Sequence, residues 1–163
     1  MKKNKTLILI RHAEALDRAQ ARKSRILDAD RALTAKGKKV FNRHIVQQAK
    51  LLSGTQVFVC SPYLRALQTL EIIQKKIKKS GSVPVTILDF ITPDDDIKKF
   101  TRWFRCQTAE KTVLIGHEPF ISNLIGFYLK SDPLNFKIRK SAVVVLQERT
   151  VAQMQIAGLY APE

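Results

Sequence analysis

The sequence feature that most constrains the fold is a run of four aliphatic residues, 7–10, that ends abruptly at Arg11 and His12. A short, uninterrupted apolar run predicts a strand that is buried on both faces, as in a parallel sheet covered by helices. Arg11 and His12 then lie at the carboxyl end of this strand, which is the edge where open α/β sheets bind ligands. The sequence therefore predicts an α/β protein with a cation and an imidazole at its binding edge.

Two later strand ends supply the same kinds of side chain. Arg65 follows the apolar run at 57–60, and His117 follows the apolar run at 113–116. Because the carboxyl ends of parallel strands meet at one edge of a sheet, we expect two arginines and two histidines to converge on one pocket. Arg65 alone would more simply be a surface cation, so this prediction depends on the convergence of all four side chains.

Length and hydropathy are those of a globular protein. The 163 residues, of which 45% are hydrophobic, suit a single domain over residues 1–163. No apolar run approaches the roughly 20 residues that span a bilayer, and the run at 7–10 is shorter than the roughly 7 to 15 apolar residues of a signal peptide. We therefore expect a cytoplasmic protein that does not enter a membrane. Cys60 and Cys106 have no metal-ligand spacing, and we expect neither to be catalytic.

Net charge is the unusual feature of the composition. Lys and Arg number 29 against 14 Asp and Glu, which gives +15 at pH 7 and a pI near 10.1. Such a field favours an anionic partner, which could be nucleic acid, a membrane surface, an acidic protein or a phosphorylated group. A solvated basic surface without a partner fits equally well. The lysines are scattered over several predicted helices, whereas a nucleic-acid-binding face would cluster them with aromatic residues, so we expect no nucleic-acid partner.

Hydrophobic periodicity and turn residues outline the remaining elements. Residues 14–33 are charged, have few apolar anchors and are expected to form a rim or lid over the first strand end. Thr34 and Ser61 are predicted helix N-caps, and His44 is predicted to be a structural histidine. Helices are predicted over about 35–52, 61–77, 92–105 and 119–129, and further strands over 56–60, 83–88, 112–116, 142–146 and 152–156. This order predicts a three-layer α/β/α sandwich with a mainly parallel central sheet.

The converging side chains suit the transfer of a phosphoryl group. Arginine forms bidentate contacts with phosphate, and a neutral imidazole can attack phosphorus and leave again when water attacks. The nearby arginines should keep His12 in this neutral, reactive form. The sequence contains no Gly-rich phosphate loop, no His-Glu-x-x-His motif and no carboxylate cluster with metal-ligand spacing. We therefore expect no metal or other cofactor, and phosphoryl transfer through a phosphohistidine.

Three motifs resemble the signatures of the histidine phosphatase superfamily, whose fold is phosphoglycerate mutase-like. They are Leu-Ile-Arg-His-Ala-Glu at 9–14, Ser-Pro-Tyr-Leu-Arg-Ala-Leu-Gln-Thr at 61–69 and Gly-His-Glu-Pro at 116–119. The short chain, together with segments 31–37, 88–93 and 141–142, resembles the SixA-type phosphohistidine phosphatases within that superfamily. Many members have glycine where this chain has Ala13.

The resemblance implies a role for each residue of the core. His12 would become phosphorylated, Arg11 and Arg65 would clamp the phosphate, and His117 would donate to the phosphoryl oxygens. Arg31 could reach the rim of the site as a substrate-binding residue, although pairing with one of the nearby acids, Asp28 or Asp30, competes evenly with that role.

The resemblance also implies an activity and a partner. The expected activity is metal-independent hydrolysis of protein phosphohistidine, on a histidine phosphotransfer domain or a phosphocarrier protein, by a monomer. A small-molecule phosphomonoesterase and a non-catalytic basic module that binds phosphate or nucleic acid are the alternatives. An alkoxide leaving group needs a proton donor, and no convincing acid is found in the sequence, which favours a phosphorus–nitrogen substrate. The acids at 94–96 are foremost helix caps, but Asp94, Asp95 or Asp96 could donate a proton.

Overall fold

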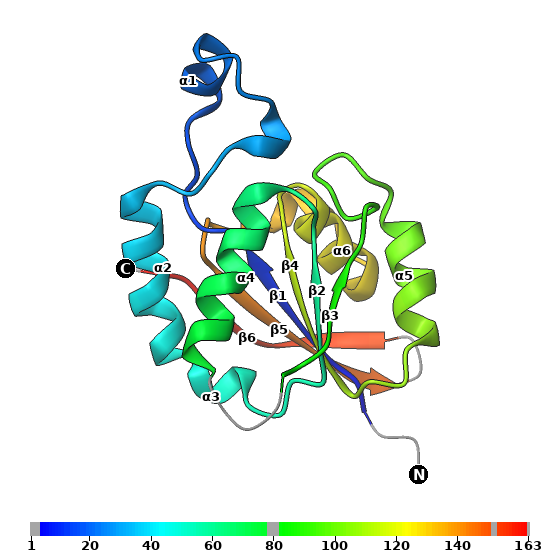
Figure 1. Ribbon diagram of the computed structural model, residues 1–163. Helices are drawn as coiled ribbons and strands as arrows, with labels where there is room; N and C mark the ends of the chain where they lie inside the picture. The colour runs from blue at the N-terminus through cyan, green and yellow to red at the C-terminus, as the bar shows by residue number, and fades with distance from the viewer. Residues whose placement is uncertain (1–3, 78–81, 151–152, 163) are drawn as a thin grey trace.

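The computed structural model describes residues 4–77, 82–150 and 153–162 of the chain. In chain order its elements are β1 (Thr6–Arg11), α1 (Arg18–Lys23), the 3-10 helix η1 (Asp28–Asp30), α2 (Ala35–Gln47), α3 (Ala49–Leu52), β2 (Val57–Cys60), α4 (Leu64–Lys76), β3 (Val85–Ile87), α5 (Ile97–Cys106), β4 (Lys111–Gly116), α6 (Phe120–Leu129), the 3-10 helix η2 (Pro133–Asn135), β5 (Val143–Thr150) and β6 (Gln153–Tyr160). Each of the first four strands is followed by at least one helix (Figure 1).

The strands form one six-stranded sheet in the order β3-β2-β4-β1-β5-β6. The first four strands are parallel to one another, and β5 runs antiparallel to both of its neighbours. In the pairing of β1 with β4, Arg11 lies opposite Gly116, so the two strands end level with each other. The residues that follow them, His12 and His117, therefore leave the sheet side by side. The mainly parallel central sheet was predicted, and the structure confirms it.

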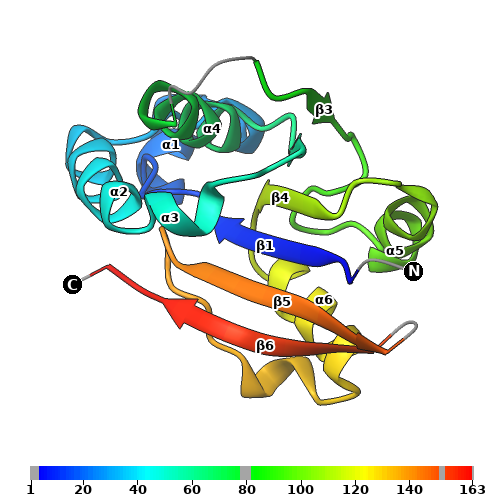
Figure 2. The ribbon, with the colours of Figure 1, turned by 90° about the horizontal axis from the view of Figure 1, so that it is seen from below.

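Alternate residues of each strand face opposite helix layers. Ile8 and Ile10 of β1 pack with α2 and α4 on one face of the sheet, whereas Leu7 and Leu9 pack with α5 and α6 on the other. Figure 2 shows the sheet between these two groups of helices. Both faces of β1 are buried, which accounts for its unbroken run of aliphatic residues. The predicted three-layer sandwich is confirmed.

Several predicted boundaries are wrong, each for a local reason. The helix predicted over 35–52 is divided at Gln48, whose ψ of 7° departs from helical geometry, into α2 and α3. The helix predicted from Ser61 begins at Leu64, because the backbone is still extended at Tyr63, with a φ of −67° and a ψ of 135°. The acids at 94–96 precede α5, with Asp96 as its N-cap. The last two strands are longer than predicted, since β5 reaches residue 150 and β6 reaches residue 160.

Residues 16–31, which we call the arm, rise above the carboxyl end of β1, away from both helix layers (Figure 1). The arm carries α1 and η1. Its two ends are held together by a bridge between Ala15 and Leu33, and by the Leu16 N–H, which donates to the Ala32 carbonyl at 2.9 Å. The charged segment predicted as a rim or lid is therefore a folded projection beside the binding edge.

The structure also bears on the two cysteines and on the length of the helices. Cys60 is buried at the end of β2 and Cys106 is exposed at the end of α5, and both thiols are free. Across the described ranges, no helix combines the length and the apolar content that crossing a bilayer requires.

Candidate active site

The structure brings the four predicted side chains together at the carboxyl ends of β1, β2 and β4. Arg65 Nε lies 3.2 Å from His12 Nε2, and the rings of His12 and His117 are 5.0 Å apart between centroids. Arg11 lines the same pocket, which has a volume of about 600 Å³. The pocket is lined by Arg11, His12, Glu14, Ala15, Asp17, Arg18, Gln20, Arg31, Thr34, Arg65, His117, Glu118 and Lys140. Five of these are Arg or Lys, two are His and three are Asp or Glu, so the pocket has an excess of positive charge that suits an anion.

The hydrogen bonds of His12 define its tautomer. Nδ1 lies 2.7 Å from the Ala13 carbonyl oxygen, which can only accept, so Nδ1 carries the proton. Nε2 accepts a hydrogen bond from Arg65 Nε–H and therefore carries the lone pair. The pKa of His12 is lowered to about 3, mainly by burial and to a smaller extent by the Arg65 and Arg11 guanidiniums. The neutral ring was predicted, but burial contributes more to it than the arginines, which had been expected to be its cause.

His117 is held by a residue of the segment that follows β2. Its Nε2 lies 2.7 Å from the Ser61 hydroxyl oxygen, while its buried Nδ1 has no partner among the residues that the structure describes. Burial lowers the pKa of His117 to about 2, with a second contribution from His12, so the ring is neutral. If the Ser61 hydroxyl donates to Nε2, the proton lies on Nδ1, where it can be donated to an anion.

Asp28 of the arm accepts two hydrogen bonds from the guanidinium of Arg65. Arg65 Nη2 donates to Asp28 Oδ2 at 3.0 Å, and Arg65 Nη1 donates to the Asp28 carbonyl at 2.6 Å. Burial acts to raise the pKa of Asp28, but the Arg65 and Arg31 guanidiniums outweigh it, so this pKa is lowered and the carboxylate stays charged. The carboxylate thus binds the clamp in the manner expected of a phosphate oxygen.

Arg31 forms the predicted pair with Asp28, and its side chain also lines the pocket. It is buried, with 8% of its surface exposed, and it lines the pocket. Its Nε donates to Asp28 Oδ1 at 2.9 Å, and its Nη1 donates to the Leu16 carbonyl at 2.5 Å. Arg31 therefore links η1 to Leu16, the first residue of the arm, while its side chain borders the site.

Arg11 is anchored from the opposite side of the pocket. Its Nη1 donates to the Ile138 carbonyl at 2.6 Å, and its buried Nε has no partner in the described part of the chain. Burial lowers the pKa of Arg11, and Glu118 acts in the opposite direction. The guanidinium thus keeps an unused donor next to the pocket, as a phosphate clamp requires.

Glu118 is an acid in the pocket that sequence analysis missed. Burial raises the pKa of its carboxyl, against the opposing effect of Ser122. The single hydroxyl proton of Ser122 faces two acceptors, Glu118 Oε2 at 2.7 Å and the Phe136 carbonyl at 2.9 Å. Glu118 Oε2 also accepts a hydrogen bond from the Ser122 backbone N–H at 3.4 Å, so the start of α6 holds this carboxyl in place. Glu118 Oε1 is buried and has no partner among the described residues.

The acids that sequence analysis considered as proton donors lie elsewhere. Asp95 accepts hydrogen bonds from the backbone and hydroxyl of Thr92, and Asp96 caps α5. Asp95 and Asp96 line a different pocket, beside α6, and Asp94 does not line the active-site pocket. Glu118 could have been considered from the sequence, because it directly follows His117.

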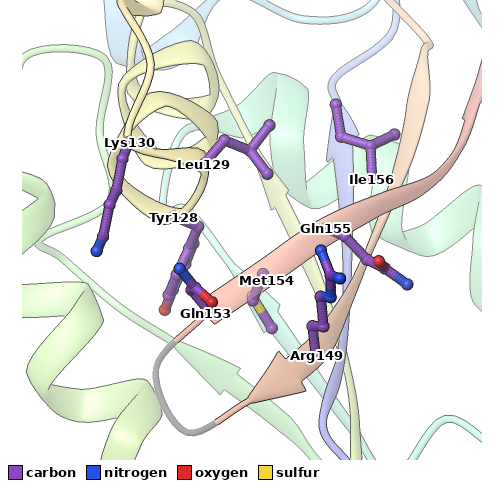
Figure 3. A pocket seen from close by; sticks show the side chains of 8 residues that line it. All are labelled: Tyr128, Leu129, Lys130, Arg149, Gln153, Met154, Gln155 and Ile156. Atoms are coloured by element: carbon purple, nitrogen blue, oxygen red, sulfur yellow. The ribbon is translucent and has the colours of Figure 1, made fainter.

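Other parts of the described structure offer no rival site with the same chemistry. Its residues contain no group of three or more His, Cys, Asp or Glu side chains that could hold a metal ion. His44 is buried on α2, outside the pocket, as predicted. A second pocket of about 260 Å³ lies between α6 and β6, where Lys130 and Arg149 border apolar side chains such as Met154 (Figure 3). None of the predicted site residues lines it.

Comparisons with known proteins agree with this geometry. The model of the histidine phosphatase superfamily (branch 1) matches residues 7–91, and no curated protein matches the sequence. The solved structure of the protein histidine phosphatase SixA complexed with tungstate has a TM-score of 0.81 and 21% identity, over 96% of this chain and 97% of that one. The α-ribazole phosphatase from Shigella flexneri has a TM-score of 0.72 and 15% identity, over 96% of each chain. The phosphoserine phosphatase from Entamoeba histolytica in complex with 3-phosphoglyceric acid has a TM-score of 0.65 and 19% identity, over 98% of each chain.

The structural neighbours, at these identities, show that the fold is shared, and the fold is phosphoglycerate mutase-like as predicted. The family model covers 85 of the 163 residues, including Arg11, His12 and Arg65, while His117 lies beyond the matched segment. The structure places His117 beside the other three. The chain therefore belongs to the histidine phosphatase superfamily.

Proposed function

We propose that this protein is a phosphohistidine phosphatase that hydrolyses protein phosphohistidine through a phosphorylated His12. The observation that carries the proposal is the lone pair of His12 Nε2, which is held inside a cationic pocket by the contacts of both ring nitrogens. A neutral imidazole beside guanidinium groups can attack an anionic phosphorus centre, because the cations offset the repulsion between the nucleophile and the phosphate.

The reaction has two steps. His12 Nε2 attacks phosphorus, the bond from phosphorus to the leaving nitrogen breaks, and that nitrogen takes up a proton. Arg11, Arg65 and His117 Nδ1–H would donate to the phosphoryl oxygens in both transition states. Water then attacks the phosphorus of phosphohistidine, the bond to Nε2 breaks, and inorganic phosphate leaves with His12 restored. Asp28 must release Arg65 for the clamp to form, since it holds two of the three guanidinium nitrogens.

The proposed substrate is a histidine phosphotransfer domain or a phosphocarrier protein. The similarity to SixA, which is named as a protein histidine phosphatase, supports this choice, as does the net charge of +15, which favours an anionic partner. We also propose that the protein acts in the cytoplasm as a monomer and without a metal ion. The charges that would bind the phosphoryl group in this pocket are supplied by arginine side chains.

The test of the mechanism is the replacement His12→Ala. The variant should lose more than 10³-fold in turnover, a typical cost of removing a nucleophile, and should form no acid-labile phosphoenzyme after rapid quenching with labelled substrate. The matched control is His44→Ala, which removes a buried histidine outside the pocket and should retain turnover while folded. A chelator should leave the wild-type rate unchanged. Retained turnover or retained phosphoenzyme in the His12 variant would falsify the assignment.

The second candidate is a small-molecule phosphomonoesterase, and Glu118 is the observation that favours it. A carboxyl in the pocket whose pKa is raised by burial could supply the proton that an alkoxide leaving group needs. Glu118→Gln keeps the size of the side chain but cannot act as an acid. We expect the wild type to prefer a phosphohistidine protein to a sugar phosphate, and the variant to lose less than tenfold on the protein. A preference for the ester, with a loss above 100-fold on the ester in the variant, would establish the second candidate instead.

A further inference from the structure

The arm carries a basic surface beside the active-site pocket. Four cations, Arg18, Arg22, Lys23 and Arg25, are exposed, and residues 18–27 contain no acid. The chain as a whole has about one acid for every two basic residues, so segment 18–27 is more strongly basic than the average of the molecule, while Asp17, Asp28 and Asp30 flank it in the rest of the arm. The arm that carries them rises above the carboxyl end of β1 (Figure 1) and contacts α4 through the hydrogen bonds between Asp28 and Arg65.

The tip of the arm adds an apolar contact surface. Ile26 is 37% exposed and Leu27 is 70% exposed, and the two are consecutive. Leu27 directly precedes Asp28, whose carboxylate lies 3.0 Å from Arg65 Nη2. This apolar pair is therefore adjacent in the chain to the group that holds the guanidinium of Arg65.

We propose that the arm is a docking surface for an acidic face of the phosphorylated protein substrate, and this inference rests on the proposed function. Carboxylates around the phosphorylated histidine would pair with Arg22, Lys23 and Arg25, and an apolar side chain of the partner would cover Leu27. Charge complementarity commits the surface to an acidic partner, and the exposed apolar pair favours a protein over a polyanion such as nucleic acid. A small phosphorylated metabolite in the pocket has no need of these residues.

The experiment compares two variants with the same change in charge. Arg22→Glu combined with Lys23→Glu alters the arm without touching any residue that lines the pocket. Lys98→Glu combined with Lys99→Glu makes the same change on α5, where both side chains are exposed. Each is assayed for kcat/KM on a histidine phosphotransfer domain phosphorylated with phosphoramidate, and on free phosphohistidine. Affinity for the phosphorylated domain is also measured by calorimetry in the His12→Ala background.

On the phosphorylated domain, the arm variant should lose at least tenfold both in kcat/KM and in affinity. On free phosphohistidine, it should lose less than twofold in kcat/KM. The α5 variant should lose less than threefold on either substrate. Leu27→Ser should show the same pattern as the arm variant. Equal losses on both substrates, or no loss on the domain, would overturn the docking proposal while leaving the phosphatase proposal intact. Loss of binding to a duplex oligonucleotide without loss on the domain would assign the arm to nucleic acid. A wild type that binds the phosphorylated domain through the arm but hydrolyses neither substrate would refute the phosphatase proposal alone.

Discussion

At the scale of single residues, the reactivity of His12 depends on whether its surroundings stabilise the neutral or the protonated imidazole. Protonation at Nε2 would place an N–H against the Arg65 Nε–H that now donates to it at 3.2 Å, and would bury a positive charge among guanidinium groups. A phosphoryl dianion in the pocket would offset part of this positive charge. By linkage, the group that holds the nucleophile neutral in the free protein also strengthens the binding of an anion.

This argument predicts an abnormal titration of two histidines. In protein labelled with ¹⁵N-histidine, the ring signals of His12 and His117 should remain those of neutral imidazole from pH 7.5 to pH 5.5, because burial lowers both pKa values far below the ordinary 6.5. An ordinary histidine would be about 90% protonated at the lower pH. Spectra of the His12→Ala and His117→Ala variants assign the signals. A midpoint near pH 6.5 for either ring would contradict the buried, neutral pair.

The residues of the site differ in how far the sequence could predict them. Arg11, His12 and His117 follow apolar strands directly, and the geometry of a parallel sheet brings such positions to one edge. Asp28 could not be placed in this way, because its contact with Arg65 depends on how the arm folds back over the pocket. A charged segment without periodicity gives no indication of that path. The same limit applies to any contact made by an arm residue.

At the scale of elements, the first turn of α4 shows local chemistry overridden by tertiary structure. Ser61 has the side chain of an N-cap, but its backbone N–H donates to the Ile115 carbonyl at 3.1 Å, and its hydroxyl lies 2.7 Å from His117 Nε2. The helix therefore begins only at Leu64. Arg65 consequently lies in the first turn of α4, within reach of His12. The residue pattern predicted that a helix forms here, whereas the pairing of Ser61 with β4 affects where the helix starts.

The start of α2 packs against the segment that follows His12, and the close approach of Gly37 to Glu14 there gives a testable prediction. A Cβ atom at Gly37 would overlap the Glu14 carbonyl, which accepts from the Thr34 N–H at 3.0 Å. Gly37→Ala should therefore lower the free energy of unfolding by about 1 to 3 kcal/mol, the usual cost of overpacking. Urea unfolding at pH 7 measures the change. Phosphatase activity should also fall, because residues 12–14 must move to make room.

The matched control for this substitution is Lys36→Ala, in the same turn of α2 but exposed to solvent. It makes no contact with residue 14 in the described structure and should change the free energy of unfolding by less than about 0.5 kcal/mol. Equal effects of the two substitutions would mean that helix propensity, and not the close approach of Gly37 to Glu14, determines stability here.

At the scale of the whole molecule, the layer architecture followed from hydrophobic pattern, but the boundaries did not. Continuous apolar runs predicted strands buried on both faces, and the two core clusters divide the residues of β1 between the helix layers. The strands β5 and β6 extend into polar residues such as Gln147 and Gln153, because pairing with a neighbouring strand satisfies their backbone groups whatever the side chain. A hydrophobic pattern ends where burial ends, whereas a strand ends where pairing ends.

The buried histidines also connect the site with the stability of the molecule. A histidine whose pKa is lowered by folding contributes stability that is complete above its ordinary pKa of 6.5 and is lost as the pH falls from there toward the folded pKa, about 3 for His12 and about 2 for His117. The lowered pKa of Asp28 acts in a different window, since its contribution is present above the ordinary 3.8 and is lost below it. Between pH 6.5 and pH 5.0 the two site histidines should therefore dominate.

The free energy of unfolding should fall across this window by about 1.5 kcal/mol for each of the two rings, because the unfolded chain binds protons that the folded chain excludes. Urea unfolding at pH 6.5, 5.8 and 5.0 measures the slope, to which His44 also adds because burial lowers its pKa, and His117→Asn should reduce the slope by the contribution of one ring. Added inorganic phosphate should raise stability, because it binds the folded state alone. A free energy that stays constant over this window would mean that the rings bind protons equally in the folded and the unfolded protein, which would contradict the lowered pKa values of His12 and His117.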